Sequence, residues 1–410
     1  MRSWPEVYLP PAPKFVKHPK LQLLDSYDKS LHSVSGDGTS IYVCGITPYD
    51  ATHLGHAATY ISFDLMHRYL TASGVRVNFC ENITDIDDPL LERAIRDNQD
   101  WRELAHSQID LFVSDMTALR VLPPENYQGV VESMSTIIKS VEMYLNKNVA
   151  YNIEGDIYLE LAKVPGFPGN LPLPLNEAIA VFSERGGDPD RVGKKHPLDP
   201  LLWRAKREGE PSWDASFGSG RPGWHVECVA IALANLPMSE NTSITIQGGG
   251  SDLTFPHHYM TAMQAKVITG MEFAETYVHA GMIGLDGEKM SKSRGNLVFV
   301  SKLLEQGIAP EALRMALISQ HYQEDRMWSN ELLQDAQVFI EKIQKALANT
   351  DVAATQPVVQ GIVEALADNL NTPRALRILD EWCEASLQGA TGGSAGDISR
   401  ALDTYLGIAL

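Results

Sequence analysis

The feature that most constrains the fold is a strand, a loop, a helix and a second strand near the start of the chain. Residues 39–44 (TSIYVC) form a β-branched and aromatic run that ends at a glycine, which predicts a strand. Apolar residues recur at helical spacing over 57–72, and 75–79 returns to a strand pattern. Such a unit usually forms a right-handed crossover in a parallel sheet, which binds ligands beyond the carboxyl ends of its strands. Cys44 and the segment 82–84 fall on that rim.

The remaining pattern predicts an insertion into the parallel fold and a helical final part. Residues 90–148 are mainly helical in pattern, 149–161 predicts a small hairpin, and 188–200 is polar and rich in turn residues. A strand at 243–247 leads into a helical pattern, so the parallel fold resumes. We expect an α/β protein with these parts: a Rossmann-like nucleotide-binding parallel sheet in 1–115 and 195–285, an inserted connective subdomain in 116–194, a lysine-loop region in 286–340 and a C-terminal helical bundle in 341–410.

The composition excludes several classes of protein. The 410 residues carry 52 acidic and 34 basic side chains, a net charge of −18, so the overall charge does not favour general nucleic-acid binding. No apolar run reaches the roughly 18 residues of a membrane span, and the proline-broken first residues lack the apolar stretch of a signal peptide. We expect a cytoplasmic protein with no membrane partner. The irregularly spaced cysteines form no disulfide framework, and each is a core thiol, a metal ligand or a reactive group: Cys44, Cys80, Cys228 and Cys383.

The first short motif is His53-Leu54-Gly55-His56, at the beginning of the predicted helix. Backbone N–H groups at a helix N-terminus attract phosphate, and imidazoles can donate hydrogen bonds to phosphate oxygens. Gly55 would allow a base or a ribose to approach closely. A polar turn before a helix explains the same residues equally well when the motif is considered alone.

The second motif, 289–293 (KMSKS), favours a nucleotide site over a simple polar turn. Lys289 and Lys292 are separated by small residues in a loop that can close over a triphosphate and neutralise the charge of leaving pyrophosphate. A solvated basic loop is the alternative. The two motifs in this order resemble the signature of class I aminoacyl-tRNA synthetases and their relatives. The resemblance implies that ATP, with Mg²⁺, activates a carboxylate as an adenylate.

Three further residues resemble the cysteine-specific branch of that family. Cys44 follows the first strand, Cys228 ends the segment GWHVEC, and His257 lies in FPHH. The resemblance implies one Zn²⁺ per chain on these residues, with a position left for the thiolate of the cysteine substrate. Four residues after His257, where cysteinyl-tRNA synthetases usually carry a glutamate, this chain has Thr261. We therefore expect three protein ligands, with His258 contacting phosphate or supporting the metal site.

The acceptor is indicated by the segment 184–189 (ERGGDP). As a sequence it is a tight glycine turn between opposite charges. It also resembles a signature of the synthetase-related ligases of mycothiol biosynthesis, which join cysteine to glucosaminyl-inositol, and the context of the first motif, 45–53 (GITPYDATH), resembles those ligases too. The resemblance runs over nearly the whole chain. We expect the acceptor pocket to be bordered by this turn and by the terminal helices.

The last part of the chain disfavours tRNA as the acceptor. A cysteinyl-tRNA synthetase needs an anticodon-reading domain after its lysine loop, whereas only 294–410 remains here. From residue 349 on, acidic side chains outnumber basic ones and would repel a phosphate backbone. The basic residues are Arg374, Arg377 and Arg400, against Asp351, Glu364, Asp368, Asp380, Glu381, Glu384, Asp397 and Asp403.

These observations predict an ATP-dependent ligase that joins L-cysteine to the amine of glucosaminyl-inositol. The alternatives are a truncated or divergent cysteinyl-tRNA synthetase and, more remotely, an inactive nucleotide-binding regulatory module. We expect His53 and His56 to stabilise phosphate, and Trp224 to form an apolar wall beside the substrate. By resemblance, the adenylate contacts Cys44, Gly45, Ile46, Thr47, Thr59, Asn82, Ile83, Thr84, Trp224, Gly250, Ser251, Asp252 and Ile283.

Overall fold

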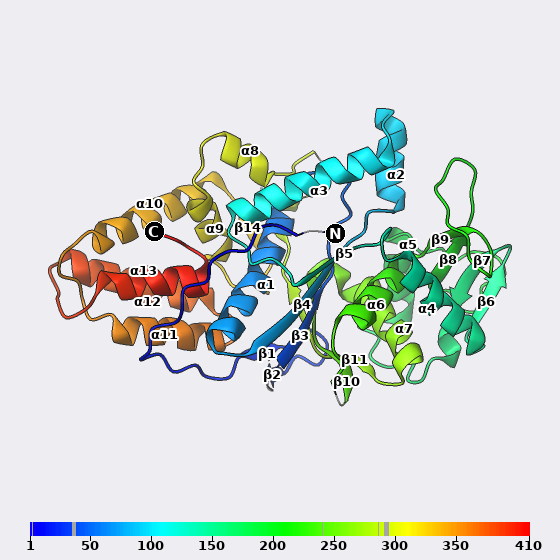
Figure 1. Ribbon diagram of the computed structural model, residues 1–410, viewed down its shortest axis with the longest axis horizontal. Helices are drawn as coiled ribbons and strands as arrows, with labels where there is room; N and C mark the ends of the chain where they lie inside the picture. Colours follow the sequence, from blue (N-terminus) through cyan, green and yellow to red (C-terminus); the bar gives the residue numbers. More distant parts are fainter. Residues whose placement is uncertain (2, 35–37, 240, 286, 291–294) are drawn as a thin grey trace.

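A five-stranded parallel sheet forms the centre of the molecule (Figure 1). The computed structural model describes residues 1, 3–34, 38–239, 241–285, 287–290 and 295–410. Each neighbouring pair in the sheet is parallel, and the strand order reverses between β3 and β10, where ligands bind in folds of this kind. In spatial order the strands are β11 (Glu272–Ala280), β10 (Thr242–Gly250), β3 (Gly38–Val43), β4 (Arg76–Ile83) and β5 (Asn126–Gly129).

The helices around this sheet begin and end where the sequence supplies capping residues. Asp87 caps α2 (Asp88–Asp97) and Asp100 caps α3 (Trp101–Ala118), each through a side-chain oxygen that accepts a backbone N–H. Gly270 ends α7 (Tyr259–Thr269) in the left-handed conformation, with φ of 77°. The first helix, α1 (Leu54–Ala72), is buried along most of its length, and α6 (Trp224–Asn235) carries Cys228.

The inserted part of the chain builds a separate antiparallel sheet to one side of the central sheet (Figure 1). The predicted hairpin is present as β6 (Ala150–Ile153) and β7 (Asp156–Leu159), with Gly155 in its turn. The sheet continues through β8 (Leu201–Ala205) and β9 (Gly220–Pro222), and α4 (Met134–Asn146) and α5 (Leu175–Glu184) accompany it.

The limits of the insertion differ from those drawn on the sequence, 116–194. The strand β5, at 126–129, pairs with β4 in the central sheet, and β8 and β9 extend the inserted sheet beyond residue 194. The short polar run of β5 (NYQG) carries no strand pattern, which explains why the sequence did not indicate it. We propose that the inserted subdomain begins after β5 and ends at β9.

The final part of the chain is helical and lies on the opposite side of the central sheet (Figure 1). A small sheet of β12 (Ile283–Leu285), β13 (Glu288–Lys289) and β14 (Arg326–Trp328) precedes most of these helices. None of the described helices is long and apolar enough to cross a membrane. The helices are α8 (Val300–Glu305), α9 (Pro310–Ile318), α10 (Asn330–Leu347), α11 (Gln356–Ala367), α12 (Thr372–Leu387) and α13 (Ala395–Ala401).

A buried group of charges joins this helical part to α1, and we call it the α1 ion cluster: Asp64, Arg68 and Arg314. The Asp64 carboxylate accepts from Arg68 at 2.7 Å and from Arg314, and each of the three side chains is 1% exposed or less. Arg314 also donates to the backbone carbonyls of Leu119 and Leu406. Burial alone would raise the pKa of Asp64, but the Arg314 and Arg68 guanidiniums hold it below its usual range.

Candidate active site and metal centre

The predicted site residues gather at the carboxyl ends of the central strands. Cys44 follows β3, Asn82 and Ile83 end β4, and Gly250 ends β10. Parallel strands point their carboxyl ends to one edge, so residues distant in sequence meet there. The edge includes the point between β3 and β10 at which the strand order reverses.

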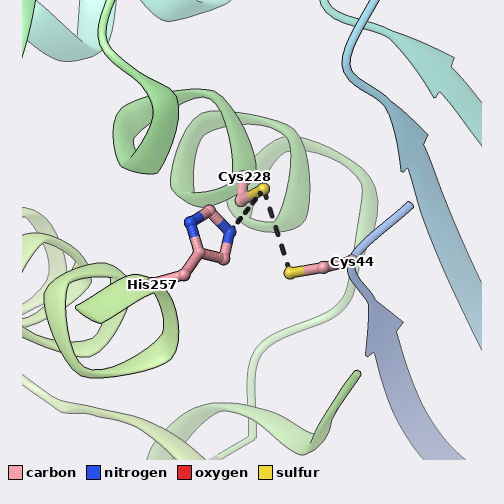
Figure 2. Close-up of side chains that lie close together, drawn as sticks. All are labelled: Cys44, Cys228 and His257. Atoms are coloured by element: carbon pink, nitrogen blue, oxygen red, sulfur yellow. Dashed lines mark hydrogen bonds between the residues drawn. The ribbon is translucent and has the colours of Figure 1, made fainter. Parts of the chain in front are cut away.

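Cys44, Cys228 and His257 form a buried group that we call the thiol cradle (Figure 2). The Sγ atoms of Cys44 and Cys228 are 3.9 Å apart, and Nε2 of His257 is 3.2 Å from Sγ of Cys228. All three ligand atoms lie within 4.8 Å of one another. The residues come from the end of β3, from α6 and from the π-helical turn before α7, so only the folded chain brings them together.

The cradle has the chemistry and the spacing of a zinc site. Two thiols and one imidazole are ligands that Zn²⁺ prefers, and tetrahedral Zn–S bonds of about 2.3 Å separate two sulfur atoms by roughly 3.8 Å. Burial opposes ionisation of Cys228, but its hydrogen bond with Cys44 and the neighbouring His257 hold its pKa well below its usual range. Burial raises the pKa of Cys44.

Three further histidines lie around the cradle: His225 and His279, which sequence reasoning did not assign, and His258, which it placed at the phosphate or the metal site. Nδ1 of His225 lies 2.9 Å from Nδ1 of His257. A metal-binding His257 keeps Nε2 free of a proton, so its Nδ1–H donates to His225 and the proton of His225 is on Nε2. On the other side, His258 places Nε2 3.2 Å from Sγ of Cys44 and Nδ1 2.7 Å from Nε2 of His279. His258 thus contacts a cradle thiol. Each contact spans at least 21 residues, which no local sequence pattern reveals.

The hydroxyl of Thr261 is not directed at the thiol cradle. Its Oγ1 donates within α7, at 3.0 Å from the carbonyl oxygen of His257 and 2.8 Å from that of His258. A hydroxyl is a poor zinc ligand, and this one is turned towards its own helix. The geometry is that of a site with three protein ligands.

The rim above the cradle is held by Asn82. Its Oδ1 accepts from the hydroxyl of Tyr42 at 2.9 Å and from the N–H of Gly45 at 3.0 Å, while its Nδ2 donates to Thr84 at 3.2 Å. The N–H of Thr84 donates to the carbonyl of Ile46. A Cβ atom on Gly45 would lie 1.4 Å from the carbonyl oxygen of Asn82, so the close approach of the two strand ends requires glycine.

The histidines of the first motif are arranged differently from the sequence expectation. His53 caps α1, and its Nδ1 accepts from the N–H groups of Gly55 at 3.1 Å and His56 at 3.4 Å. These two N–H groups are therefore occupied by a side chain. The rings of His53 and His56 stack with their centroids 3.7 Å apart, and burial lowers the pKa of His56 well below its usual value. His56 is a neutral imidazole next to the helix end.

The second motif lies largely outside the described residues. Lys289 ends β13, where its backbone pairs with Gly284, and its side chain is not among those described. Lys292 lies outside the described residues altogether. Their role at the leaving pyrophosphate stays a prediction.

The other predicted contact residues occupy four places. Thr47, Trp224 and Asp252 line one cavity of about 820 Å³ beside the cradle, and the ring of Trp224 stacks on that of His257 with centroids 4.2 Å apart. The described residues that line this cavity also include the 184–188 turn and none from α10, α11, α12 or α13, and whether the terminal helices border the acceptor pocket stays a prediction. Thr59 is turned back to the carbonyl of Gly55, while Gly250 and Ser251 follow one another at the end of β10 and Ile283 is buried in β12.

The turn at 184–188 also contacts the metal-site loop. Nη1 of Arg185 donates to the carbonyl oxygens of Asp252 and Phe255, in the segment that leads to His257. A cation that bonds two backbone carbonyls fixes the path of both. The inserted subdomain thereby helps to position a predicted metal ligand of the central domain.

The central sheet, the histidine-capped α1 and the thiol cradle define a nucleotide-binding fold of the class I synthetase kind. The family model described as tRNA synthetases class I (C) catalytic domain matches residues 30–338. A Mycobacterium tuberculosis methionyl-tRNA synthetase in complex with methionyl-adenylate superposes with a TM-score of 0.62 at 16% identity, covering 90% of this chain and 88% of that one. The predicted fold class is confirmed by this likeness.

Curated relatives match the chain from end to end. An L-cysteine:1D-myo-inositol 2-amino-2-deoxy-alpha-D-glucopyranoside ligase of Streptomyces griseus is 50% identical over 417 residues, with 100% of both chains covered. A protein of the same name from Segniliparus rotundus is 50% identical over 428 residues, again with both chains covered completely. The chain belongs to the class I synthetase family, in the group that contains these cysteine ligases.

Proposed function

We propose that this protein joins L-cysteine to the amine of 1D-myo-inositol 2-amino-2-deoxy-alpha-D-glucopyranoside at the expense of ATP. The observation that carries the proposal is the full-length match, 50% identical, to ligases of that name. The thiol cradle supports it, because two thiols and an imidazole at the ligand-binding edge suit a substrate that carries sulfur. The product is a precursor in mycothiol biosynthesis.

In the first step, the carboxylate oxygen of cysteine attacks the α-phosphorus of ATP. A C–O–P anhydride forms, the bond to the β-phosphate oxygen breaks, and pyrophosphate leaves with the electron pair. We assign His53 and His56 to the phosphate chain, since they stand at the start of α1, and Lys289 and Lys292 to the leaving pyrophosphate. Mg²⁺ enters with ATP.

In the second step, the amine nitrogen of the amino sugar attacks the activated carbonyl carbon. The C–N bond of an amide forms, the C–O bond to AMP breaks with its electron pair on AMP, and the nitrogen releases a proton to solvent, as the ammonium form of the amino sugar did before the attack. Asn82, which holds Gly45 and Thr84 at one rim, keeps the strand ends fixed around the adenylate.

The cradle selects the amino acid. Zn²⁺ bound by Cys44, Cys228 and His257 would offer an open position that a thiolate fills far better than a hydroxyl does. An apolar pocket alone separates close isosteres by only about 1–3 kcal/mol. Trp224, stacked on His257, adds an apolar face on which a small side chain can pack.

Cysteine-dependent exchange between ATP and pyrophosphate tests the first step, and AMP release tests the second. We expect exchange with cysteine but not with serine, and AMP release with the amino-sugar acceptor. Absence of exchange would contradict cysteine activation. Charging of tRNA without formation of the amide would instead identify a cysteinyl-tRNA synthetase.

A further inference from the structure

The cavity beside the thiol cradle extends well beyond the space that cysteine needs. Its volume is about 820 Å³. Thr47, Trp224 and His225 line the end near the cradle, and α2 and the 184–188 turn line the part that reaches into the inserted subdomain. A second ligand can therefore approach the activated carboxyl group from the side of the insertion.

Four of the five arginines in the wall of this cavity are already paired with carboxylates, and the fifth, Arg185, bonds backbone carbonyls. Arg221, only 5% exposed, binds Asp88 and lies 3.0 Å from Glu210. Arg207 lies 2.9 Å from Asp156. The same acidic groups neutralise the other two arginines of this wall, Arg191 and Arg204. An anionic ligand would have to displace these ion pairs.

Four carboxylates of the wall, Asp87, Glu92, Glu184 and Asp252, keep binding capacity that the described part of the chain does not use, and Asp252 is already a predicted adenylate contact. Oδ1 of Asp87 caps α2 by accepting the N–H of Asp88 at 2.8 Å, and Oδ2 has no hydrogen-bond partner among the described residues. Burial raises the pKa of Asp87 to about 6, which leaves it mostly ionised at neutral pH. Glu184, at the end of α5, makes no hydrogen bond or ion pair within the described residues. Overall, carboxylates outnumber guanidiniums in the lining, seven to five.

Asp87 lies at the cradle end of the cavity. It follows the end of β4, where Asn82 and Ile83 lie, by four residues, and it lines the cavity together with Trp224 and His225, whereas Glu184 ends α5. His225 is 7% exposed and lines the same end, and its Nε2 has no partner among the described residues. With Nδ1 engaged by His257, this Nε2–H is a buried donor that a ligand oxygen can satisfy.

We propose that this cavity is the acceptor subsite, in which the Asp87 carboxylate binds the ammonium group of the amino sugar beside the activated carbonyl. Glu184 and the ion-paired arginines bind hydroxyl groups of the remaining polyol, and His225 Nε2–H donates to an acceptor or adenylate oxygen. The assignment rests on the proposed function and identifies where its second substrate binds. An ammonium with many hydroxyls matches the wall, since a net negative lining attracts a cation and charged groups form strong hydrogen bonds with hydroxyls.

The test compares two half-reactions in the full-length protein. Asp87→Asn keeps a capping side chain for α2 but removes the charge. We expect the KM of the amino-sugar acceptor to rise about tenfold or more, and by a larger factor than any change in cysteine-dependent ATP–pyrophosphate exchange. Glu184→Gln should raise the same KM by a smaller factor. The uncharged analogue with a hydroxyl in place of the amine should inhibit the wild type weakly and lose little further affinity in Asp87→Asn.

The matched controls are Glu177→Gln, an exposed position on the same helix as Glu184, and Asp100→Asn, which alters the cap of α3. Both should leave the acceptor KM unchanged. An unchanged KM in Asp87→Asn, or a loss of exchange as large as the loss of AMP release, would overturn the subsite. Absence of exchange in the wild type would instead overturn the proposed function and the subsite derived from it.

Discussion

Two groups of buried polar side chains differ in how completely they are hydrogen-bonded. In the α1 ion cluster, Asp64 is paired with two guanidiniums, and Arg314 also bonds two backbone carbonyls. Around the thiol cradle, buried polar atoms are left without partners among the described residues, including Oε1 of Gln247 and Nδ1 of His279. A buried polar group without a partner costs stability, so the completed bonds of the α1 ion cluster suit a structural role, whereas the open atoms beside the cradle are available to a ligand.

The largest expected effect comes from removing a cradle ligand. Cys228→Ala should abolish zinc binding and lower cysteine-dependent exchange at least about a thousandfold, which corresponds to roughly 4 kcal/mol. Metal content and exchange rate are the measurements. Cys383→Ala, another buried thiol, on α12, is the control and should retain zinc. Full activity in a zinc-free Cys228→Ala protein would show that zinc is not needed for the proposed function.

The corresponding substitution in the other group of buried side chains disrupts the α1 ion cluster. Asp64→Asn leaves two buried guanidiniums without their carboxylate and should lower the free energy of unfolding by about 3–5 kcal/mol. Urea titration measures this loss, and zinc content of the folded fraction should be unaffected. Glu341→Gln removes an exposed pair with Lys345 and should change stability by less than about 0.5 kcal/mol. A similar loss in both variants would show that pairing in the cluster contributes little.

A smaller effect is expected from the histidine behind the cradle. His225→Ala removes the ring that holds Nδ1 of His257 and should weaken zinc affinity about 10- to 100-fold, without preventing binding. Competition with a chelator gives the affinity. His106→Ala, an exposed position on α3, serves as the control. Equal affinity in the two variants would mean that His225 does not position the ligand.

Asp115 sharpens the comparison because it is a buried carboxylate without a guanidinium partner. Burial raises its pKa to about 7, and its Oδ2 has no partner among the described residues. A raised pKa stabilises the fold below the unfolded pKa near 4, and this stability is lost as pH rises through about 7. Asp115→Asn should therefore be more stable than the wild type at pH 8, by up to about 4 kcal/mol, since the shift is roughly three pKa units at about 1.36 kcal/mol each, with the difference vanishing below pH 4. Urea titrations across this range should show the crossover, and a constant difference would contradict it.

The smallest effect is expected at Thr261. Its hydroxyl bonds the carbonyls of its own helix, so Thr261→Ala should keep zinc and exchange activity and change stability by less than about 1 kcal/mol. Loss of zinc would show that the hydroxyl reaches the metal after all.

The sequence predicted those parts of the molecule that are encoded locally. The helix at 57–72 is present as α1, extended to residue 54 because His53 caps it, and the hairpin at 149–161 is β6 and β7. Cys44, Cys228 and His257 were named because their surrounding segments resemble a known family. Spacing alone would not have joined residues as far apart as 44 and 228.

The parts that the sequence did not predict depend on contacts between distant segments. Arg314 reaches Asp64 across 250 residues, and His225 meets His257 only because α6 packs beside the turn before α7. In both pairs, neither the sequence separation nor the neighbouring residue types distinguish the two residues from ordinary surface or core residues. The polar strand β5 was missed for a related reason, since its place in the sheet is set by β4 and not by its own residues.

The bonds of Arg314 have a consequence for how the chain is made. Asp64 lies on the helix that His53 caps, but its partner Arg314 is synthesised 250 residues later, and the carbonyl of Leu406 that Arg314 also binds is synthesised later still. Until then a nascent chain on the ribosome carries a carboxylate that must stay hydrated rather than packed. We therefore expect that α1 settles into its final position only after Leu406 has been synthesised, and that the ATP site matures after that point.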